Sequence, residues 1–279
     1  MKTAAVVCVA LVFVAWGFNG HRTAARSGGR LAAPLRVCAD PNNLPFSNRA
    51  GEGFENRLAD MIAKDFGTTV VTTWWPQRRG FVRNTLDAGA CDVILGVPTA
   101  LERVDTTQPY YRSTYVFVAS RRRHFRIRSL DDPLLHRLRI GVQMIGDDFA
   151  NSPPAHALSA RGIVRNIVGY SVVGDYSRPN PPARIVEAVA RGEIDVALVW
   201  GPLAGYFGAR QVVPLELTPV SPRAGSPSLP FTFAISMAVR RGDHFRRQAL
   251  DRFIVDRRDA IDRLLDEYHV PRAATKGGL

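Results

Sequence analysis

Apolar and polar positions follow one pattern twice along this chain. Residues 82–98 and 185–202 each read as an amphipathic helix, a glycine that ends it, an aspartate three residues later and an apolar strand that runs into a proline. The two aspartates are Asp92 and Asp195. An amphipathic helix followed by a continuous apolar strand is typical of a parallel sheet covered by helices.

Each copy of the pattern also has its own opening strand, at residues 36–39 and 139–142. The spacing from the first residue of that strand to the aspartate is the same in both copies, 92 − 36 = 56 and 195 − 139 = 56. One unit repeated twice predicts two similar α/β lobes, and two lobes that face each other form a cleft. The repeat therefore favours ligand capture over catalysis.

The rest of the periodicity predicts strands that alternate with helices, which implies parallel sheets built from right-handed crossovers. The predicted strands are 35–40, 69–75, 92–97, 115–120, 138–143, 163–168, 195–200 and 231–241. The predicted helices are 54–66, 80–88, 153–161, the repeat helix that begins near 183, 243–256 and 258–268.

We expect an α/β protein of two lobes, each a mostly parallel sheet flanked by helices. The first lobe comprises residues 35–114 plus 241–279, and the second comprises residues 115–240. Two crossings between the lobes, near 111–118 and 236–240, are expected to form a hinge.

Residues 1–33 have the pattern of a signal peptide. Lys2 precedes an apolar run at 4–18, and a polar, basic stretch follows at 19–30. The run is shorter than the roughly 20 residues of a membrane span. An uncleaved N-terminal anchor is the alternative. The mature chain has no other candidate span, so we expect a soluble, exported protein.

Composition and charge limit the classes of partner that we expect this protein to bind. The formal net charge is +12, and four of the basic residues precede Pro34 with no acid among them, which leaves 33 − 25 = +8 for the mature body. This surplus favours anionic membrane surfaces, acidic proteins or anionic ligands. We expect no nucleic acid as a partner, since no nucleic-acid module is visible. Cys38 and Cys91 are the cysteines of the mature chain, and whether they form a disulfide is left open.

Catalysis and cofactors find little support in the sequence. The six histidines are scattered without metal-binding spacing, and there is no Cys-x-x-Cys and no glycine-rich phosphate loop after a strand. We expect no enzyme activity, no cofactor and no metal. An enzyme derived from the same fold, with Asp40 or Glu102 as a base, is a third and weaker alternative.

The cleft is expected at the carboxyl ends of the parallel strands, where α/β proteins bind ligands. Polar and aromatic side chains follow those strands in both lobes: Asp40, Asn42, Asn43, Phe46, Trp75, Gln77, Arg78, Arg79, Pro98, Thr99, Gln143, Met144, Asp147 and Trp200.

Several of these residues have a structural alternative. Asn42 and Asn43 stand beside prolines and are equally typical of turns. Trp74 and Trp75 are adjacent on a strand and face opposite ways, so one is expected in the core and the other at the cleft or a partner. Asp92 and Asp195 begin strands at the far end from the cleft, which favours a structural role.

A basic run at 120–128 has five arginines in nine residues. Such runs are commonly solvated loops. The alternative is a docking patch for an acidic partner, formed by Arg121, Arg122 and Arg123.

Four segments carry a resemblance to a known family: GFENRLADMIAKDFG (53–67), GACDVILGV (89–97), PYYRSTYVFVA (109–119) and GEIDVALVW (192–200). They resemble the bacterial periplasmic solute-binding proteins of the polar-amino-acid type (family 3). The resemblance covers roughly residues 35–270 and implies the type II periplasmic-binding-protein fold with a two-crossing hinge.

Four longer motifs are similar to one branch of that family: CADPNNLPFSN (38–48), WWPQRRGFVRNTL (74–86), TTQPYYRSTYVFV (106–118) and LLDEYHVP (264–271). Its members are the J-type accessory proteins encoded beside pyrroloquinoline-quinone methanol dehydrogenases. The resemblance implies a periplasmic protein that supports the dehydrogenase by binding the enzyme, a partner segment or a small ligand. The alternative is an importer's receptor for a small polar or anionic solute such as an amino acid.

One departure from the wider family concerns its ligand. Amino-acid-binding members place an arginine after the third strand, where it clamps the ligand carboxylate. Here the corresponding loop is PTALERVD, and Arg103 stands about one position out of register. The departure counts against an amino-acid ligand.

Overall fold

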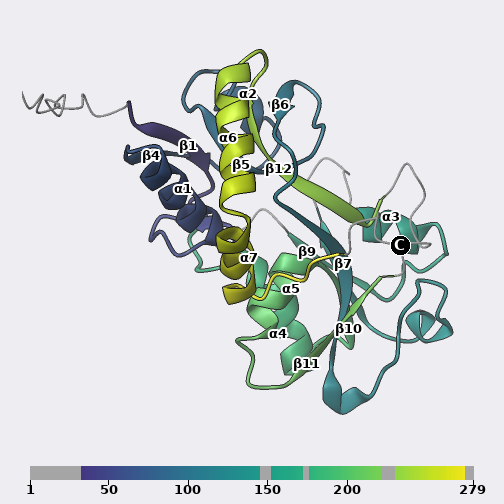
Figure 1. Cartoon of the computed structure of the whole chain (residues 1–279). Helices are drawn as coiled ribbons and strands as arrows, with labels where there is room; N and C mark the ends of the chain where they lie inside the picture. The colour runs from purple at the N-terminus through teal and green to yellow at the C-terminus, as the bar shows by residue number, and fades with distance from the viewer. Residues whose placement is uncertain (1–32, 145–151, 172–175, 221–229, 274–279) are drawn as a thin grey trace, which may run out of the picture. The chain divides into compact units, whose positions relative to one another are not determined.

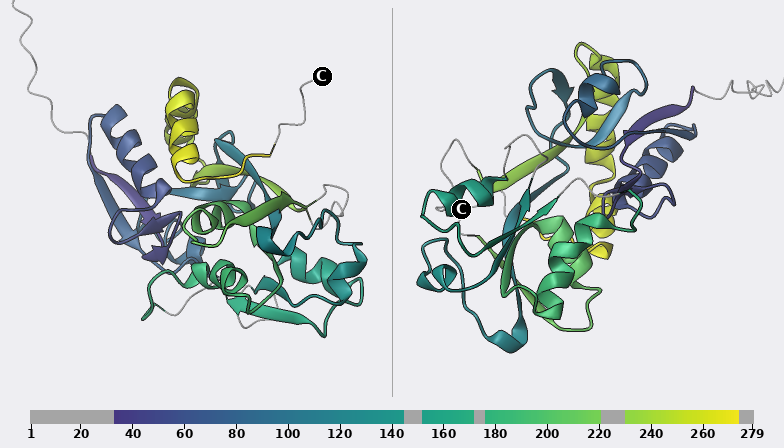
Figure 2. Two further views of the ribbon diagram at one scale, coloured as in Figure 1. Left: turned by 90° about the horizontal axis from the view of Figure 1, so that it is seen from below. Right: turned by 180° about the vertical axis from the view of Figure 1, so that it is seen from behind.

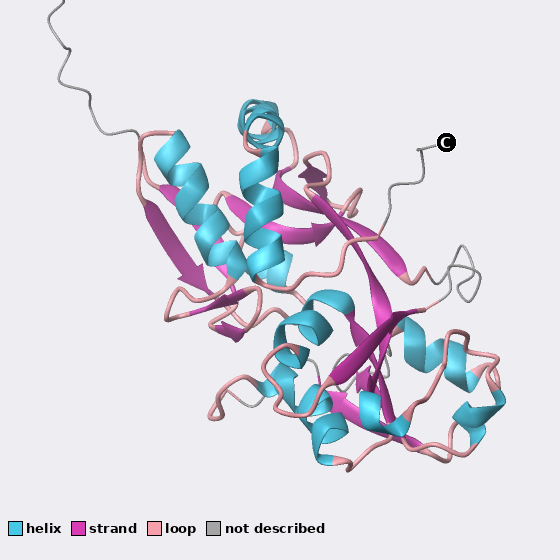
Figure 3. Cartoon of the chain, turned by 60° about the horizontal axis from the view of Figure 1, so that its bottom comes forward, coloured by secondary structure: helices cyan, strands magenta, loops and turns pink. Residues whose placement is uncertain are grey.

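The computed structural model describes residues 33–144, 152–171, 176–220 and 230–273 (Figure 1). One sheet path runs through these residues in the order β4-β1-β5-β12-β7-β10-β8-β9, with β11 paired to β7 and β6 paired to β12. Helices flank the strands (Figure 3). Among the described residues, we find no helix with the length and apolar character that a bilayer crossing requires.

The first group of strands is parallel. β1 (Leu35–Ala39) lies between β4 (Val70–Trp74) and β5 (Val93–Pro98), with Val37 opposite both Thr72 and Val93. α1 (Phe54–Asp65) connects β1 to β4 and buries Phe54, Leu58 and Ile62 completely. Both faces of a parallel sheet are covered by other parts of the chain, which explains the apolar runs in the sequence at these strands.

A second parallel group is built in the same way. β8 (Ile140–Met144) lies between β9 (Ile167–Ser171) and β10 (Val196–Trp200). Three α-helices belong to this part of the chain: α3 (Pro153–Ser159), α4 (Arg184–Arg191) and α5 (Gly201–Gly208). Three short 3₁₀ helices accompany them: η1 (Arg121–Arg123), η2 (Pro133–His136) and η3 (Pro181–Ala183).

Two long antiparallel strands join the groups. β7 (Tyr111–Ser120) pairs with β12 (Thr232–Arg240) over its first four residues, then with β10 from Tyr115 onward. β12 continues along β5 and along β6 (Val104–Thr106), while β11 (Leu215–Pro219) lies on the other side of β7. From Ile235 onward, β12 therefore pairs with β5 and belongs to the sheet of the N-terminal strands.

The repeated unit has the same backbone contact in both copies. The Asp92 amide donates to the Arg36 carbonyl at 2.8 Å, and the Asp195 amide donates to the Arg139 carbonyl at 2.9 Å. The shared spacing of 56 is therefore the spacing of a hydrogen-bonded pair. The two glycines of the repeat, Gly89 in a turn and Gly192 at the end of α4, have positive φ, 73° and 74°, which glycine tolerates without strain.

The C-terminal helices complete the first group. α6 (His244–Asp256) and α7 (Arg258–Glu267) lie on the same side of the first strand group as α1 in all the views (Figure 2). Phe253 of α6 packs edge-to-face on Phe66, and Arg257 forms an ion pair with Asp65.

The last described residues, 268–273, form a segment that crosses between the two groups, which we call the C-terminal strap. The Tyr268 hydroxyl donates to the Glu52 carbonyl, and the Tyr268 ring stacks on Tyr206 of α5 with centroids 5.7 Å apart. The Ser113 hydroxyl donates to the Pro271 carbonyl at 2.6 Å. At Gly205 of α5 an added Cβ would lie 1.9 Å from the His269 carbonyl oxygen, so the strap packs directly on the helix backbone.

Most predicted elements are present, but several bounds differ. The helix predicted at 80–88 is the single turn α2 (Phe81–Asn84), followed by turns. β7 begins at Tyr111 rather than at 115, and β9 begins at Ile167 rather than near 163. The sequence patterns did not predict β6, β11, α5 or the hairpin of β2 (Asn42–Asn43) and β3 (Ser47–Asn48).

Cys38 and Cys91 form a disulfide, the question that the sequence left open. Their Cα atoms are 5.5 Å apart. Cys38 lies opposite Ile94 in the strand register, three positions beyond Cys91. A straight strand would separate the two cysteines, but Cys91 precedes β5 and is not extended along it. Both side chains are buried, so the bridge ties β1 to the turn before β5.

Candidate functional site

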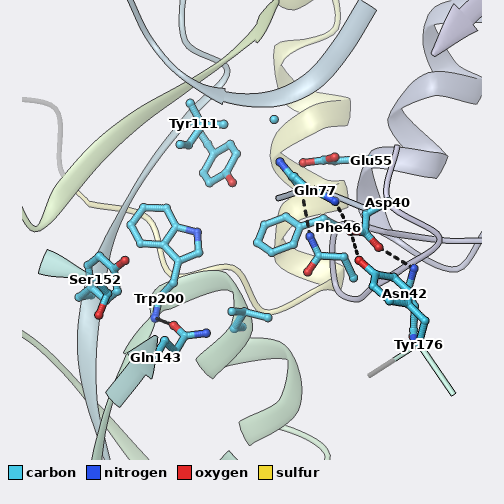
Figure 4. A pocket seen from close by; sticks show the side chains of 15 residues that line it. Asp40, Asn42, Phe46, Glu55, Gln77, Tyr111, Gln143, Ser152, Tyr176 and Trp200 are labelled. Carbon is cyan, nitrogen blue, oxygen red and sulfur yellow. Dashed lines mark hydrogen bonds between the residues drawn. The ribbon is translucent and has the colours of Figure 1, made fainter. Parts of the chain in front are cut away.

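A cavity of about 280 Å³ lies at the carboxyl ends of the parallel strands (Figure 4). Residues from both strand groups line it: Asp40, Asn42, Asn43, Phe46, Glu55, Gln77, Gly96, Tyr111, Tyr115, Gln143, Ser152, Tyr176, Trp200, Leu203 and Ile235. The hydrogen bonds between segments that are far apart in sequence show how its walls are held.

Asp40 holds one side of the cavity together. It follows β1 and is 4% exposed. Its Oδ1 accepts from the Asn42 amide at 2.8 Å, and its Oδ2 accepts from the Gln77 amide at 2.6 Å and from the Tyr176 hydroxyl at 2.8 Å. Burial, and then the bond to Asp40, raise the pKa of Tyr176 well above its usual range, which keeps this hydroxyl protonated as the donor.

The Asn42 side chain adds a second connection between the same segments. Its Nδ2 donates to the Arg178 carbonyl at 2.8 Å, and its Oδ1 accepts from the Asn180 amide at 3.3 Å. Asn43 donates from Nδ2 to Gln77 Oε1 at 3.0 Å. The two asparagines thus sit in a tight hairpin, as the turn interpretation predicts, and also reach neighbouring segments, while contact with a ligand stays a prediction.

Aromatic rings form the opposite wall. Trp200 packs edge-to-face on Tyr115 at 5.4 Å and on Phe233 at 5.7 Å. The Trp200 amide donates to Gln143 Oε1 at 3.1 Å, and Gln143 is buried. Burial raises the pKa of Tyr115 to about 12, so its hydroxyl stays neutral. The Tyr115 hydroxyl is therefore an uncharged hydrogen-bond donor on an otherwise apolar wall.

Glu55 lies in the first turn of α1, between the Asp40 loop and β5 (Figure 4). Its carboxyl stands against the backbone of Gly96, where an added Cβ would come within 2.1 Å of Oε1. Burial, and then the charge of Asp40, raise the pKa of Glu55 to about 8. Burial and the charge of Glu55 also raise the pKa values of Tyr110 and Tyr111 well above their usual range.

Seven of the residues proposed from sequence line this cavity: Asp40, Asn42, Asn43, Phe46, Gln77, Gln143 and Trp200. Six others do not line it: Trp75, Arg78, Arg79, Pro98, Thr99 and Met144. The Thr99 hydroxyl contacts Ser236 and the Ala234 carbonyl, and Met144 packs against β9 at Gly169. Asp147 lies outside the described residues.

The expectation that one of the paired tryptophans lies in the core is wrong. Trp75 is 38% exposed, and Trp74 is only partly buried beneath the guanidinium of Arg49. The reason is that β4 is the edge strand of the sheet, so its last residues have a neighbour on one side only.

Sequence patterns missed the remaining lining residues: Glu55, Gly96, Tyr111, Tyr115, Ser152, Tyr176, Leu203 and Ile235. Glu55 is the first-turn acid of a helix, and such acids are ordinarily explained by the helix dipole. Tyr111 and Tyr115 lie within a strand rather than after one. The lining residues that the sequence did predict carried a positional signal, since all of them lie at or soon after the carboxyl end of a strand.

The two repeat aspartates are structural, as expected. Asp92 accepts from Arg36 at 2.7 Å and from Arg240 at 2.7 Å, and Arg246 lies 3.8 Å away. These contacts, led by the hydrogen bond from Arg36, lower the pKa of Asp92 to about 2. Asp195 accepts from the Arg139 amide at 2.9 Å and pairs with Arg123.

The basic patch proposed from sequence is the exposed helix η1. Arg121, Arg122 and Arg123 are all exposed. Arg123 is engaged with Asp195 and lies over the Phe125 ring at 5.2 Å. Across the described part of the chain, Arg121 and Arg122 have no ion pair, so they are the cations that η1 presents to solvent.

Among the described residues that line the cavity, none corresponds to the family arginine that clamps a ligand carboxylate. Arg103 pairs with Asp87 at 3.1 Å and is not a lining residue. Within the ranges that the structure describes, no cluster of three histidine, cysteine, aspartate or glutamate side chains is placed to hold a metal ion.

Comparison with solved structures defines the class of protein. The crystal structure of the periplasmic binding protein XoxJ from Methylobacterium extorquens AM1 superposes with a TM-score of 0.71 and 35% sequence identity, covering 86% of this chain and 100% of that chain. The fold is therefore that of the periplasmic binding proteins, which confirms the predicted fold class.

Comparison of sequences defines the family. The chain is 30% identical over 247 residues to Protein MoxJ of Methylorubrum extorquens, covering 86% of this chain and 82% of that protein. Protein MoxJ of Paracoccus denitrificans is 29% identical, with coverage of 85% and 88%. No protein-family model matches. The chain belongs to the MoxJ and XoxJ family, which confirms the resemblance to the J-type branch.

Proposed function

We propose that this protein is a periplasmic, non-enzymatic accessory protein of a quinoprotein methanol or alcohol dehydrogenase. Family membership with MoxJ and XoxJ over 86% of the chain is the observation that carries the proposal. Export through the N-terminal segment and the division into lobes 35–114 plus 241–279 and 115–240 belong to the same proposal.

The motifs that carry the family resemblance occur in contacting pairs, which supports the proposal. The 38–48 and 74–86 motifs meet at the cavity through Asp40 and the Gln77 amide. The 106–118 and 264–271 motifs meet at the C-terminal strap through Ser113 and Pro271. The branch-specific residues thus build one cavity wall and the strap, features that serve recognition and fixed geometry rather than bond-breaking chemistry.

Docking on the dehydrogenase is assigned to η1. Arg121 and Arg122 are exposed cations, and the mature body carries an excess of positive charge, so an acidic surface is the complementary partner. Arg123 contributes less, because Asp195 already neutralises it.

The test measures binding to a quinoprotein methanol dehydrogenase from the same organism, by biolayer interferometry at several salt concentrations. We expect a complex whose affinity falls with salt, and the double variant Arg121→Ala, Arg122→Ala to weaken it and to flatten the salt dependence. The control is Arg252→Ala, Arg263→Ala, which removes two exposed arginines from α6 and α7. Equal affinity of the two double variants contradicts the docking assignment, and no binding at all contradicts the accessory role.

An importer's solute receptor is the second candidate, and a cavity lined from both strand groups favours it. It predicts tight binding of a small polar solute together with no contact with the dehydrogenase. Melting-temperature screening against solutes, run beside the binding assay, separates the two functions.

A further inference from the structure

The cavity contains one acidic side chain that no neighbour engages. Asp40 lines the cavity, but its carboxylate already accepts three hydrogen bonds. The Glu55 carboxyl also lines it and accepts no hydrogen bond from any described residue. The Glu55 side chain is partly buried, and a partly buried carboxyl group without a donor is costly, because burial removes some of its water without replacement.

A second polar group in the cavity is unpaired as well. Ser152 is 1% exposed, and its Oγ has no hydrogen-bond partner within the described ranges. It precedes α3 but does not cap that helix. Figure 4 shows Ser152 beside Trp200 and Glu55 across the cavity from it. Two unpaired oxygens on different walls of one cavity form an acceptor set for a ligand that donates hydrogen bonds.

The remaining walls fit a positive charge. The rings of Phe46, Tyr111, Tyr115 and Trp200 line the cavity. Aromatic faces attract ammonium and guanidinium groups, more strongly where water is excluded. Among the described lining residues none is basic, so no group there would neutralise a bound carboxylate.

We propose that this cavity binds the head group of an organic cation, an alkylammonium or a guanidinium, with Glu55 as its counter-ion and Ser152 as an additional acceptor. The cation is either a free amine or guanidine or the tip of a lysine or arginine of a partner. The cavity volume of about 280 Å³ admits a small head group with a short alkyl chain. The inference goes beyond the accessory role and does not depend on docking through η1.

Binding of the cation is coupled to a proton. The titratable groups that act on Glu55 are Asp40 after β1 and Tyr110 and Tyr111 at the start of β7. Both tyrosines are neutral and Asp40 is negative, so the raised pKa of Glu55, about 8, leaves its carboxyl mostly protonated at pH 7. A cation has to displace that proton, so affinity rises as the pH increases from 6 to 8.5.

The test uses isothermal titration of the full mature chain with n-butylammonium and n-butylguanidinium at pH 8.5. The neutral 1-pentanol and the anionic valerate are size-matched controls. We expect one or both cations to bind, with at least about tenfold weaker binding of pentanol and valerate. At pH 7, heats measured in phosphate and in HEPES, neither of which is a primary ammonium ion, are expected to reveal release of about one proton per cation bound.

Glu55→Gln is expected to reduce cation affinity at least about tenfold, since a charge-assisted contact is lost. Glu102→Gln, which removes an exposed carboxylate outside the cavity, leaves the affinity unchanged. Thermal melting of both variants checks that they are folded. Equal binding of pentanol and butylammonium, preference for valerate, absence of cation binding up to 10 mM or a Glu55→Gln variant of full affinity would each overturn the inference.

A third arm separates the two sources of the cation. A glycine-rich peptide with one central lysine or arginine is titrated beside the free cations. Binding of the peptide assigns the cavity to a partner's side chain, and binding of the free cations alone assigns it to a small solute. Either outcome requires Glu55, whereas failure of the dehydrogenase assay leaves this result unaffected.

Discussion

The hydroxyl of Tyr176 donates a 2.8 Å hydrogen bond to the carboxylate of Asp40, two residues that stand 136 positions apart. Together with Asn42, which contacts Arg178 and Asn180, this bond fastens the loop after β1 to the segment before η3. The contact closes one side of the cavity. It joins a loop of the first strand group to a loop of the second, and between these two loops the chain crosses from one group to the other along β7.

Tyr176→Phe is expected to loosen this closure. A hydrogen bond to a charged acceptor contributes about 1.5–3 kcal/mol, so amide hydrogen exchange in residues 38–48 and 176–184 should accelerate about tenfold or more. Tyr170→Phe is the matched control, because the Tyr170 hydroxyl has no hydrogen bond to a described residue. Equal exchange in the two variants would show that the Asn42 contacts suffice without Tyr176.

Asp92→Asn is expected to cost more stability than Asp195→Asn. Asp92 is the common partner of Arg36 and Arg240, and its side chain is 10% exposed. Breaking a largely buried ion pair costs about 3 kcal/mol, whereas the pair between Asp195 and Arg123 is more exposed and contributes about 1 kcal/mol or less. Urea unfolding at pH 7 measures the difference.

The same aspartate predicts a limit to acid stability. Because the pKa of Asp92 is lowered to about 2 in the folded chain, its contribution is complete above its ordinary pKa and is lost as the pH falls toward 2. The difference in unfolding free energy between the protein and Asp92→Asn should therefore shrink between pH 4 and pH 2. A constant difference over that interval contradicts the charge contribution.

Removing the disulfide is expected to destabilise the chain through its unfolded state. The bridge closes a loop between residues 53 positions apart, for which chain entropy gives about 4 kcal/mol. The variant Cys38→Ala, Cys91→Ala should unfold at lower urea concentration than the oxidised protein. A phosphine reductant should lower the midpoint of the parent and leave the double variant unchanged, and a parent insensitive to reduction despite complete thiol release contradicts the estimate.

Glu55 predicts the opposite pH trend from Asp92. Its pKa is raised from 4.5 to about 8 in the folded chain, so the folded state holds a proton that the unfolded state has released. Stability from this group is complete below about pH 4.5 and falls as the pH rises toward 8, by up to about 1.4 kcal/mol per pH unit. Glu55→Gln should become progressively more stable relative to the parent from pH 5 to pH 8, while Glu102→Gln should track the parent. Urea midpoints at four pH values measure this.

The sequence predicted the elements whose burial is simple. β1, β5 and β10 are apolar runs because both of their faces are covered, and α1 shows its buried stripe at Leu58 and Ile62. α5 escaped prediction because it is buried nearly all round and contains Gly201, Pro202 and Gly205. Such residues ordinarily argue against a helix, yet here they permit close packing.

The cavity could be predicted only in part for a related reason. Residues at or just beyond the carboxyl ends of strands, such as Asp40, Gln143 and Trp200, are placed by the general rule for parallel sheets. Tyr176 reaches the cavity from a loop, and its place depends on a contact with a residue 136 positions away. Glu55 has an ordinary helical position, and only the enclosure by Gly96 and the tyrosines distinguishes it.

The C-terminal strap has a consequence for recognising related chains by sequence. Position 205 accepts no side chain larger than a hydrogen atom while the His269 carbonyl stays where it is, since an added Cβ would lie 1.9 Å from that oxygen. A relative that keeps a strap in this position must therefore have a glycine at this point of its helix, and in this chain the strap also stacks Tyr268 on Tyr206. The residue at this point of the helix is therefore one that a comparison of sequences can check directly, even when overall identity is low.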